Sequence, residues 1–74
     1  MIKIYIRDIN GTREIWEFDN EELFYSFCLT NEPSEDVYEI QMVVWNGYCI
    51  YSGLEGRYNG NGNITFEELT SFFA

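Results

Sequence analysis

Residues 37–51 read VYEIQMVVWNGYCIY, and this stretch decides the fold class of the chain. Its residues alternate between two faces as far as Trp45, and a period of two is typical of a half-buried strand. Asn46-Gly47 then favours a two-residue type I′ turn, because both central positions of that turn need positive φ. The residues after the turn are again suited to a strand. The stretch therefore predicts a hairpin with strands near residues 37–45 and 48–52.

An alternating segment also opens the chain, with isoleucines on one face of a predicted strand near residues 2–8. A turn at Asn10-Gly11 leads into a return strand near residues 13–18. A two-residue loop would place Ile4 opposite Glu17. A three-residue loop of residues 10–12 pairs Ile4 with Phe18 instead. This second register keeps apolar side chains opposite each other, so we expect it.

Helix-start signals follow each predicted hairpin. Asp19 is suited to cap a helix near residues 20–30, with Glu22 three positions later, and Thr65 with Glu68 forms a capping box for a helix near residues 65–73. The element order is therefore β-β-α-β-β-α. We expect residues 1–74 to form one α+β domain, an antiparallel four-stranded sheet with two helices on one face.

The sequence contains one incomplete metal-binding motif. Residues 59–69 resemble most of an EF-hand calcium loop, with Glu68 at the position of the bidentate ligand. Arg57 stands where the first Asp ligand belongs, and a cation there repels Ca²⁺. The chain has no histidine, so its two cysteines cannot complete a tetrahedral zinc site. We expect no metal ion and no cofactor.

The two cysteines and the N-terminal residues of the sequence indicate the cellular compartment. Cys28 and Cys49 stand among apolar residues, which favours two buried, reduced thiols over a disulfide. The chain begins directly with a predicted strand and shows neither a signal peptide nor a transmembrane span. We expect a cytoplasmic protein, in the cytoplasm of the host cell if a phage encodes it.

Adjacent carboxylates are the only candidates for catalysis. They occur at Glu21/Glu22, Glu35/Asp36 and Glu67/Glu68. General acid–base chemistry needs two carboxyl groups with separated pKa values in one cleft that excludes water. The first and third pairs instead suit the first turn of a helix, where the dipole favours negative charge, and the second lies in a polar connection. We expect no enzymatic activity.

The net charge is −9 on 74 residues, and it is polarised along the chain. Residues 14–56 contain ten acidic residues and no basic one. Such a field costs stability by self-repulsion and suits a partner with a positively charged groove. Glu17 and Asp19 lie two apart on a predicted strand, about 6.6–6.8 Å along its axis, close to the roughly 7 Å between successive phosphates of one nucleic-acid strand. The acidic candidates for partner binding are Glu17, Asp19, Glu21, Glu22, Glu35, Asp36 and Glu39.

The predicted second hairpin adds an apolar candidate surface. Its inward face is expected to hold Tyr38, Ile40, Met42 and Val44, so that Val37, Val43, Trp45, Tyr48 and Ile50 point outward. This outer face is more apolar than a monomer needs, and exposed apolar patches mark contact sites. We expect Trp45 or Tyr48 to act as an apolar anchor, since aromatic residues dominate binding energies at interfaces.

In size, charge and aromatic content the chain is similar to small acidic inhibitors from phages and mobile elements, of the anti-CRISPR and antirestriction type. The resemblance implies an inhibitor that occupies a nucleic-acid-binding site of a larger protein as a nucleic-acid mimic, without itself binding nucleic acid. The alternative is a non-enzymatic interaction subunit, for example a homodimer formed through the second hairpin. Salt separates the two, because a charge-driven complex weakens steeply with salt and an apolar dimer does not.

Overall fold

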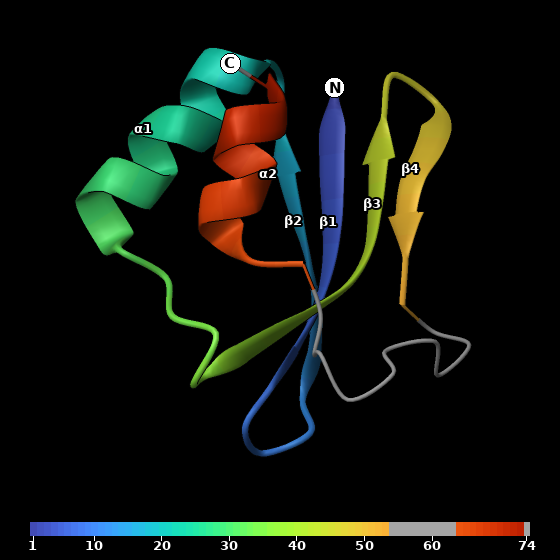
Figure 1. Cartoon of the computed structure of the whole chain (residues 1–74). Helices are drawn as coiled ribbons and strands as arrows, with labels where there is room; N and C mark the ends of the chain where they lie inside the picture. The colour runs from blue at the N-terminus through green and yellow to red at the C-terminus, as the bar shows by residue number, and fades with distance from the viewer. Residues whose placement is uncertain (54–63, 74) are drawn as a thin grey trace.

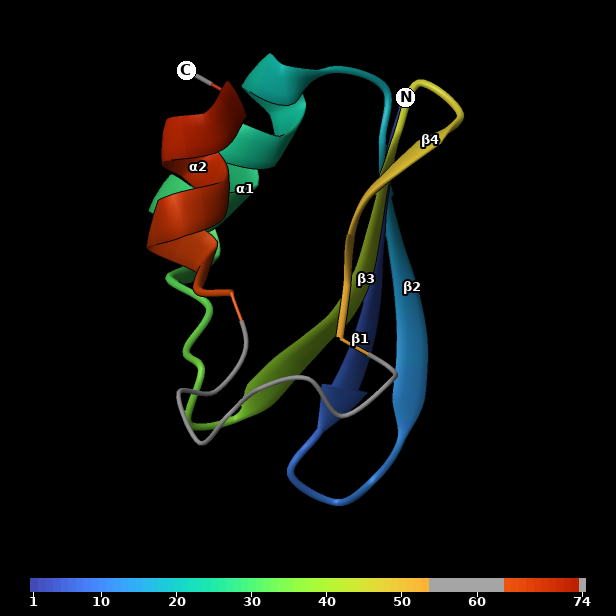
Figure 2. The ribbon, with the colours of Figure 1, turned by 45° about the vertical axis from the view of Figure 1, so that its right-hand side comes forward.

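The chain forms two layers, an antiparallel sheet and a pair of helices that cover one face of it (Figures 1 and 2). The computed structural model describes residues 1–53 and 64–73. The four strands are ordered β2-β1-β3-β4 in the sheet. The predicted α+β fold and the order ββαββα are confirmed, and each bound lies within one residue of its prediction: β1 (Ile2–Asp8), β2 (Arg13–Phe18), α1 (Glu21–Asn31), β3 (Tyr38–Trp45), β4 (Tyr48–Ser52) and α2 (Phe66–Phe73).

The core lies between the sheet and the two helices. The isoleucines of β1 are at most 1% exposed, because β1 is paired on both edges and covered by the helices. Phe24 of α1 and Leu69 of α2 are fully buried against them. Trp16 of β2 joins the layers, since its ring lies 5.0 Å from that of Phe27 and 5.8 Å from that of Phe66. Large aromatic side chains thus fill a core that a short chain could not otherwise build.

The first hairpin has the predicted loop length but not the predicted register. Ile4 pairs with Trp16, so the expected pairing with Phe18 is wrong. The three-residue loop consists of residues 9–11, closed by a backbone hydrogen bond of 2.9 Å between Asp8 N and Thr12 O. This register differs from the predicted one by two positions, and each side chain therefore stays on its predicted face. Hydrophobic alternation alone cannot distinguish the two registers.

The chemistry of the turn selects the observed register. The Asp8 carboxylate accepts hydrogen bonds of 2.9 Å from the backbone N–H groups of both Asn10 and Thr12. Gly11 adopts φ +84, a conformation that glycine reaches without steric cost. Both features place the turn one residue earlier than the sequence pattern suggested.

The helix starts are capped by side chains, although one cap differs from the prediction. Asn20, and not Asp19, is the N-cap of α1, because its side chain accepts from Leu23 N at 2.9 Å. The predicted capping box of α2 is confirmed. Thr65 Oγ1 accepts from Glu68 N, and Glu68 Oε1 accepts from Thr65 N, both at 3.0 Å.

β3 contains a β-bulge at Gln41. Ile40 pairs with Ile6 and Met42 pairs with Tyr5, so Gln41 has no partner of its own on β1. One extra residue moves every following side chain of the strand to the opposite face of the sheet. Hydrophobic alternation is therefore interrupted in the middle of β3.

The faces predicted for the second half of β3 are wrong because of this bulge. Val43 is fully buried, and Trp45 packs against the core on the face that the helices cover. Met42 and Val44 lie on the opposite face, where they pair with Tyr5 and Lys3. The apolar outer face expected for the hairpin thus loses Val43 and Trp45, and also Tyr48, which pairs with Trp45, and Ile50, which packs against the core. It gains Met42 and Val44.

Candidate partner-binding surfaces

Charge is divided unequally between the two layers. We call residues 19–36 and 64–73 the helix layer, which has eight acidic residues and no basic one, a formal charge of −8. The strands and their turns, residues 2–18 and 38–52, have four acidic and three basic residues, a formal charge of −1. The acidic residues of the helix layer are Asp19, Glu21, Glu22, Glu32, Glu35, Asp36, Glu67 and Glu68.

The open face is the side of the sheet that the helices leave uncovered. Cross-strand pairing places Ile15, Tyr5 and Met42 in one row, and Ile15 is 53% exposed. The cations of the described residues, Lys3, Arg7 and Arg13, occupy neighbouring rows. Charge is therefore nearly balanced on this face. Its residues are Lys3, Tyr5, Arg7, Arg13, Ile15, Glu17, Glu39, Met42, Val44, Cys49 and Ser52.

Two of the seven predicted acidic site residues belong to the open face and not to the helix layer. Glu17 lies opposite Lys3 in the pairing of β1 with β2. Glu39 Oε1 forms an ion pair of 2.8 Å with Arg7 and also accepts from Gln41 Nε2 at 3.1 Å. Nearby cations offset both charges, so these residues contribute little to a long-range negative field.

Asp19, Glu21 and Glu22 come together at the N-terminal end of α1. The Trp45 indole N–H donates a hydrogen bond to Glu21 Oε1, joining the end of β3 to the start of α1. Hydrogen bonds from its own backbone N–H and from Trp45 hold the pKa of Glu21 below its ordinary value. Glu21 is therefore a fixed, ionised carboxylate. Trp45 is packed against Phe73 and Phe72 and is not an outward-facing anchor.

Glu35 and Asp36 lie in the connection between α1 and β3, at the opposite end of the domain from the start of α1 (Figure 1). Glu35 Oε2 accepts from Phe66 N at 3.2 Å, so this carboxylate also caps the start of α2. Asp36 is exposed. The seven predicted residues therefore do not form one surface but divide among the two ends of the helix layer and the open face.

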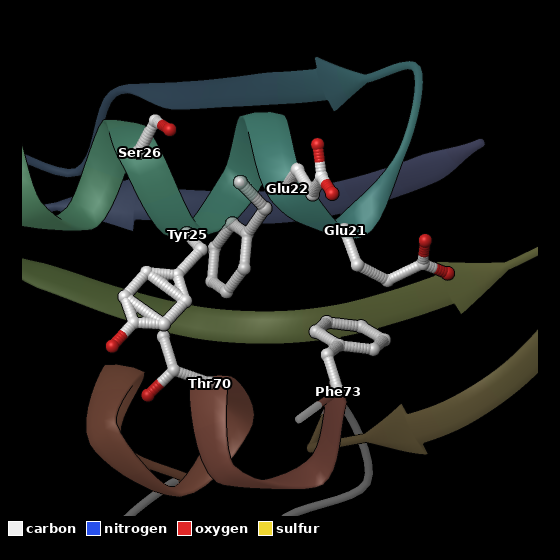
Figure 3. A pocket seen from close by; sticks show the side chains of 7 residues that line it. Glu21, Glu22, Tyr25, Ser26, Thr70 and Phe73 are labelled. Carbon is white, nitrogen blue, oxygen red and sulfur yellow. The ribbon is translucent and has the colours of Figure 1, made fainter.

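A groove between α1 and α2 was not predicted from the sequence. It encloses about 340 Å³, at the lower end of the range of about 300–1,000 Å³ for small-ligand sites. Figure 3 shows Tyr25 reaching from α1 and Phe73 from α2 into the space between the helices. The fully buried Phe24 also lines it, and Glu21 and Glu22 supply its charge. Helical periodicity indicated that Phe73 faces inward, but no sequence signal showed where two helices would leave a gap.

The remaining candidate residues are placed as follows. Tyr48 is 76% exposed beside the turn at Asn46-Gly47, as an apolar anchor requires. Cys28 and Cys49 are both free thiols, as expected, but only Cys28 is partly buried, and the exposure of Cys49 corrects the prediction of two buried thiols. Burial raises the pKa of Cys28 to about 11.

The described residues were compared with the requirements of a metal site and of a membrane-spanning helix. Within residues 1–53 and 64–73, no three His, Cys, Asp or Glu side chains are grouped so as to hold a metal ion. The prediction that the EF-hand-like loop binds no calcium ion rests mostly on residues 57–63, which lie outside the described residues. Neither α1 nor α2 is long and apolar enough to cross a membrane.

Comparison of the chain with protein-family models, with curated proteins and with solved structures gives no match.

Proposed function

We propose that this protein binds a positively charged partner through its helix layer and thereby occupies a nucleic-acid-binding site of that partner. The observation that carries this proposal is the division of charge. The helix layer contains eight acidic residues and no basic one, whereas Lys3, Arg7 and Arg13 lie on the opposite face of the sheet. A field concentrated on one side of a small domain orients the domain as it approaches a basic groove.

Three acids of the helix layer are held at defined positions by hydrogen bonds: Glu21 by the Trp45 indole, Glu35 by Phe66 N and Glu68 by Thr65 N. Carboxylates that are already ordered can replace phosphates in a basic groove without a large loss of side-chain entropy on binding. The same field repels phosphates, so the protein itself should not bind DNA or RNA. This is the mode of action of the nucleic-acid-mimicking inhibitors that the sequence resembles.

Two double variants with equal changes in charge test the proposal. Glu22→Gln with Glu67→Gln neutralises exposed acids of the helix layer, and Glu14→Gln with Glu17→Gln neutralises exposed acids of β2. None of these four carboxylates accepts a hydrogen bond from another described residue, so folding should be unaffected. The immobilised protein is used to capture partners from cell lysate. The association rate, its salt dependence and displacement of the partner's DNA or RNA are then measured.

We expect the helix-layer variant to associate about tenfold more slowly, with a flatter salt dependence, because steering by such fields changes on-rates by about 10–10³-fold. The variant of β2 should behave like the unmodified protein. The proposal fails if both variants keep the same rate and salt slope, or if the captured partner binds its nucleic acid equally well in the presence of this protein.

One observation favours the alternative of a homodimer. The open face has a central apolar row and nearly balanced charge, so two copies of a chain of net charge −9 can approach there with little repulsion. The dimer surface proposed in this alternative is the middle of the sheet, at Tyr5, Ile15 and Met42, in place of the second hairpin. Sedimentation at increasing protein concentration tests it. A dimer that persists in high salt and is lost in Ile15→Lys would support the alternative.

A further inference from the structure

We propose that the groove between α1 and α2 binds an arginine side chain of the partner. This inference rests on the proposed function and names the chemical group that anchors the helix layer to a basic surface. The groove combines an apolar lining with three aromatic side chains and two carboxylates in about 340 Å³, which is sufficient for one long side chain. Figure 3 shows these groups on the two facing helices.

The aromatic rings provide surfaces on which a planar cation can stack. Tyr25 projects from α1 and is 51% exposed, so its ring is available to a ligand. Phe73 projects from α2 toward the same space. The buried Phe24 also lines the groove, with its ring 5.6 Å from that of Phe73. A guanidinium group stacks on such rings, and the methylene stem of arginine covers apolar surface.

The carboxylates supply the charge complement. Glu21 lies at one end of the groove, oriented by its bond to Trp45, and Glu22 is exposed at its rim. The last turn of α2 has no basic side chain, so the negative end of its dipole has no cation within that turn. These charges together outweigh the positive end of the α1 dipole, which amounts to about half an elementary charge.

Arginine fits this combination better than lysine does. Its guanidinium is planar, presents several N–H donors to a carboxylate in a fixed fork and is weakly hydrated. The ammonium of lysine is a compact, strongly hydrated charge that stacks less well on aromatic faces. An arginine bound here would have its guanidinium over the ring of Tyr25, with its N–H groups directed to the carboxylates of α1, and its stem along Phe73.

Two short peptides test the inference directly with the full chain. Acetyl-Gly-Arg-Arg-Gly-amide and its lysine counterpart are titrated into ¹⁵N-labelled protein at low ionic strength. The indole N–H of Trp45 reports on the groove, because it is hydrogen-bonded to Glu21. We expect the arginine peptide to shift this resonance together with the amides of Tyr25 and Thr70, and to bind more tightly than the lysine peptide.

Matched variants separate the groove from the general acidic field. Tyr25→Ala should weaken binding of the arginine peptide about two- to fivefold, the usual range for an exposed cation–π contact, and Tyr25→Phe should restore it. Glu22→Gln should weaken it more than Glu14→Gln does, although both change the net charge equally.

Any of three results would overturn the inference. These are equal effects of Glu22→Gln and Glu14→Gln, equal affinity for the two peptides, and resonance shifts confined to residues outside the groove. The helix-layer proposal would survive such results, because partner capture and nucleic-acid displacement test it separately.

Discussion

The bulge at Gln41 can be tested by shortening two neighbouring side chains of β3 to alanine and comparing the losses in the free energy of unfolding. Val43 is fully buried in the core, whereas Met42 is half-buried on the open face. Val43→Ala removes two methyl groups from the core, and each buried carbon group contributes about 0.8 kcal/mol of transfer free energy. The cavity left behind adds to this, so we expect the free energy of unfolding to fall by about 2–3 kcal/mol.

Met42→Ala removes more atoms but should cost less than about 1.5 kcal/mol, because water already reaches part of the side chain. A chain of 74 residues has a free energy of unfolding of roughly 4–11 kcal/mol, at about 0.05–0.15 kcal/mol per residue, so both variants should stay folded. Urea denaturation followed by circular dichroism measures both losses. Strict alternation along β3 predicts the reverse order, and a larger loss for Met42→Ala would refute the bulge.

Three further predictions concern caps, thiols and pH. Thr65→Ala should lower the free energy of unfolding by about 1 kcal/mol in urea denaturation, and Thr65→Ser should restore it, because only the hydroxyl acceptor is needed. In a timed alkylation of the native protein, mass spectrometry should find Cys49 modified well before Cys28, whose burial raises its pKa to about 11; equal rates would contradict this. On acidification, the Trp45 indole resonance should shift with a midpoint below the usual glutamate pKa, because hydrogen bonds from its own backbone N–H and from Trp45 lower the pKa of Glu21. The stabilisation from this contact is present above the unfolded-state pKa of Glu21 and is lost as pH falls through the folded-state pKa. A midpoint above the usual glutamate pKa would count against the hydrogen bond.

The local elements of this protein are determined by short stretches of sequence. Alternation from Ile2 to Arg7, the turn signal at Asn46-Gly47 and the capping box of Thr65 with Glu68 each act over a few residues, and each produced the expected element. Within each hairpin the strands are antiparallel because a short turn joins them. These features depend on backbone conformation and side-chain period, which neighbouring residues fix.

Tertiary contacts decided the features on which the proposed function depends. The bulge at Gln41 arises from the fit of β3 against β1, and it exchanges the faces of Met42 and Val43. Glu35 caps α2, 31 positions away, and Glu21 accepts from Trp45, 24 positions away. The sequence determined that the chain is acidic and where the acids lie along it. The tertiary structure alone decided which acids share a surface. It also decided that two helices leave a groove beside them, because both features arise from packing between segments that are distant in the chain.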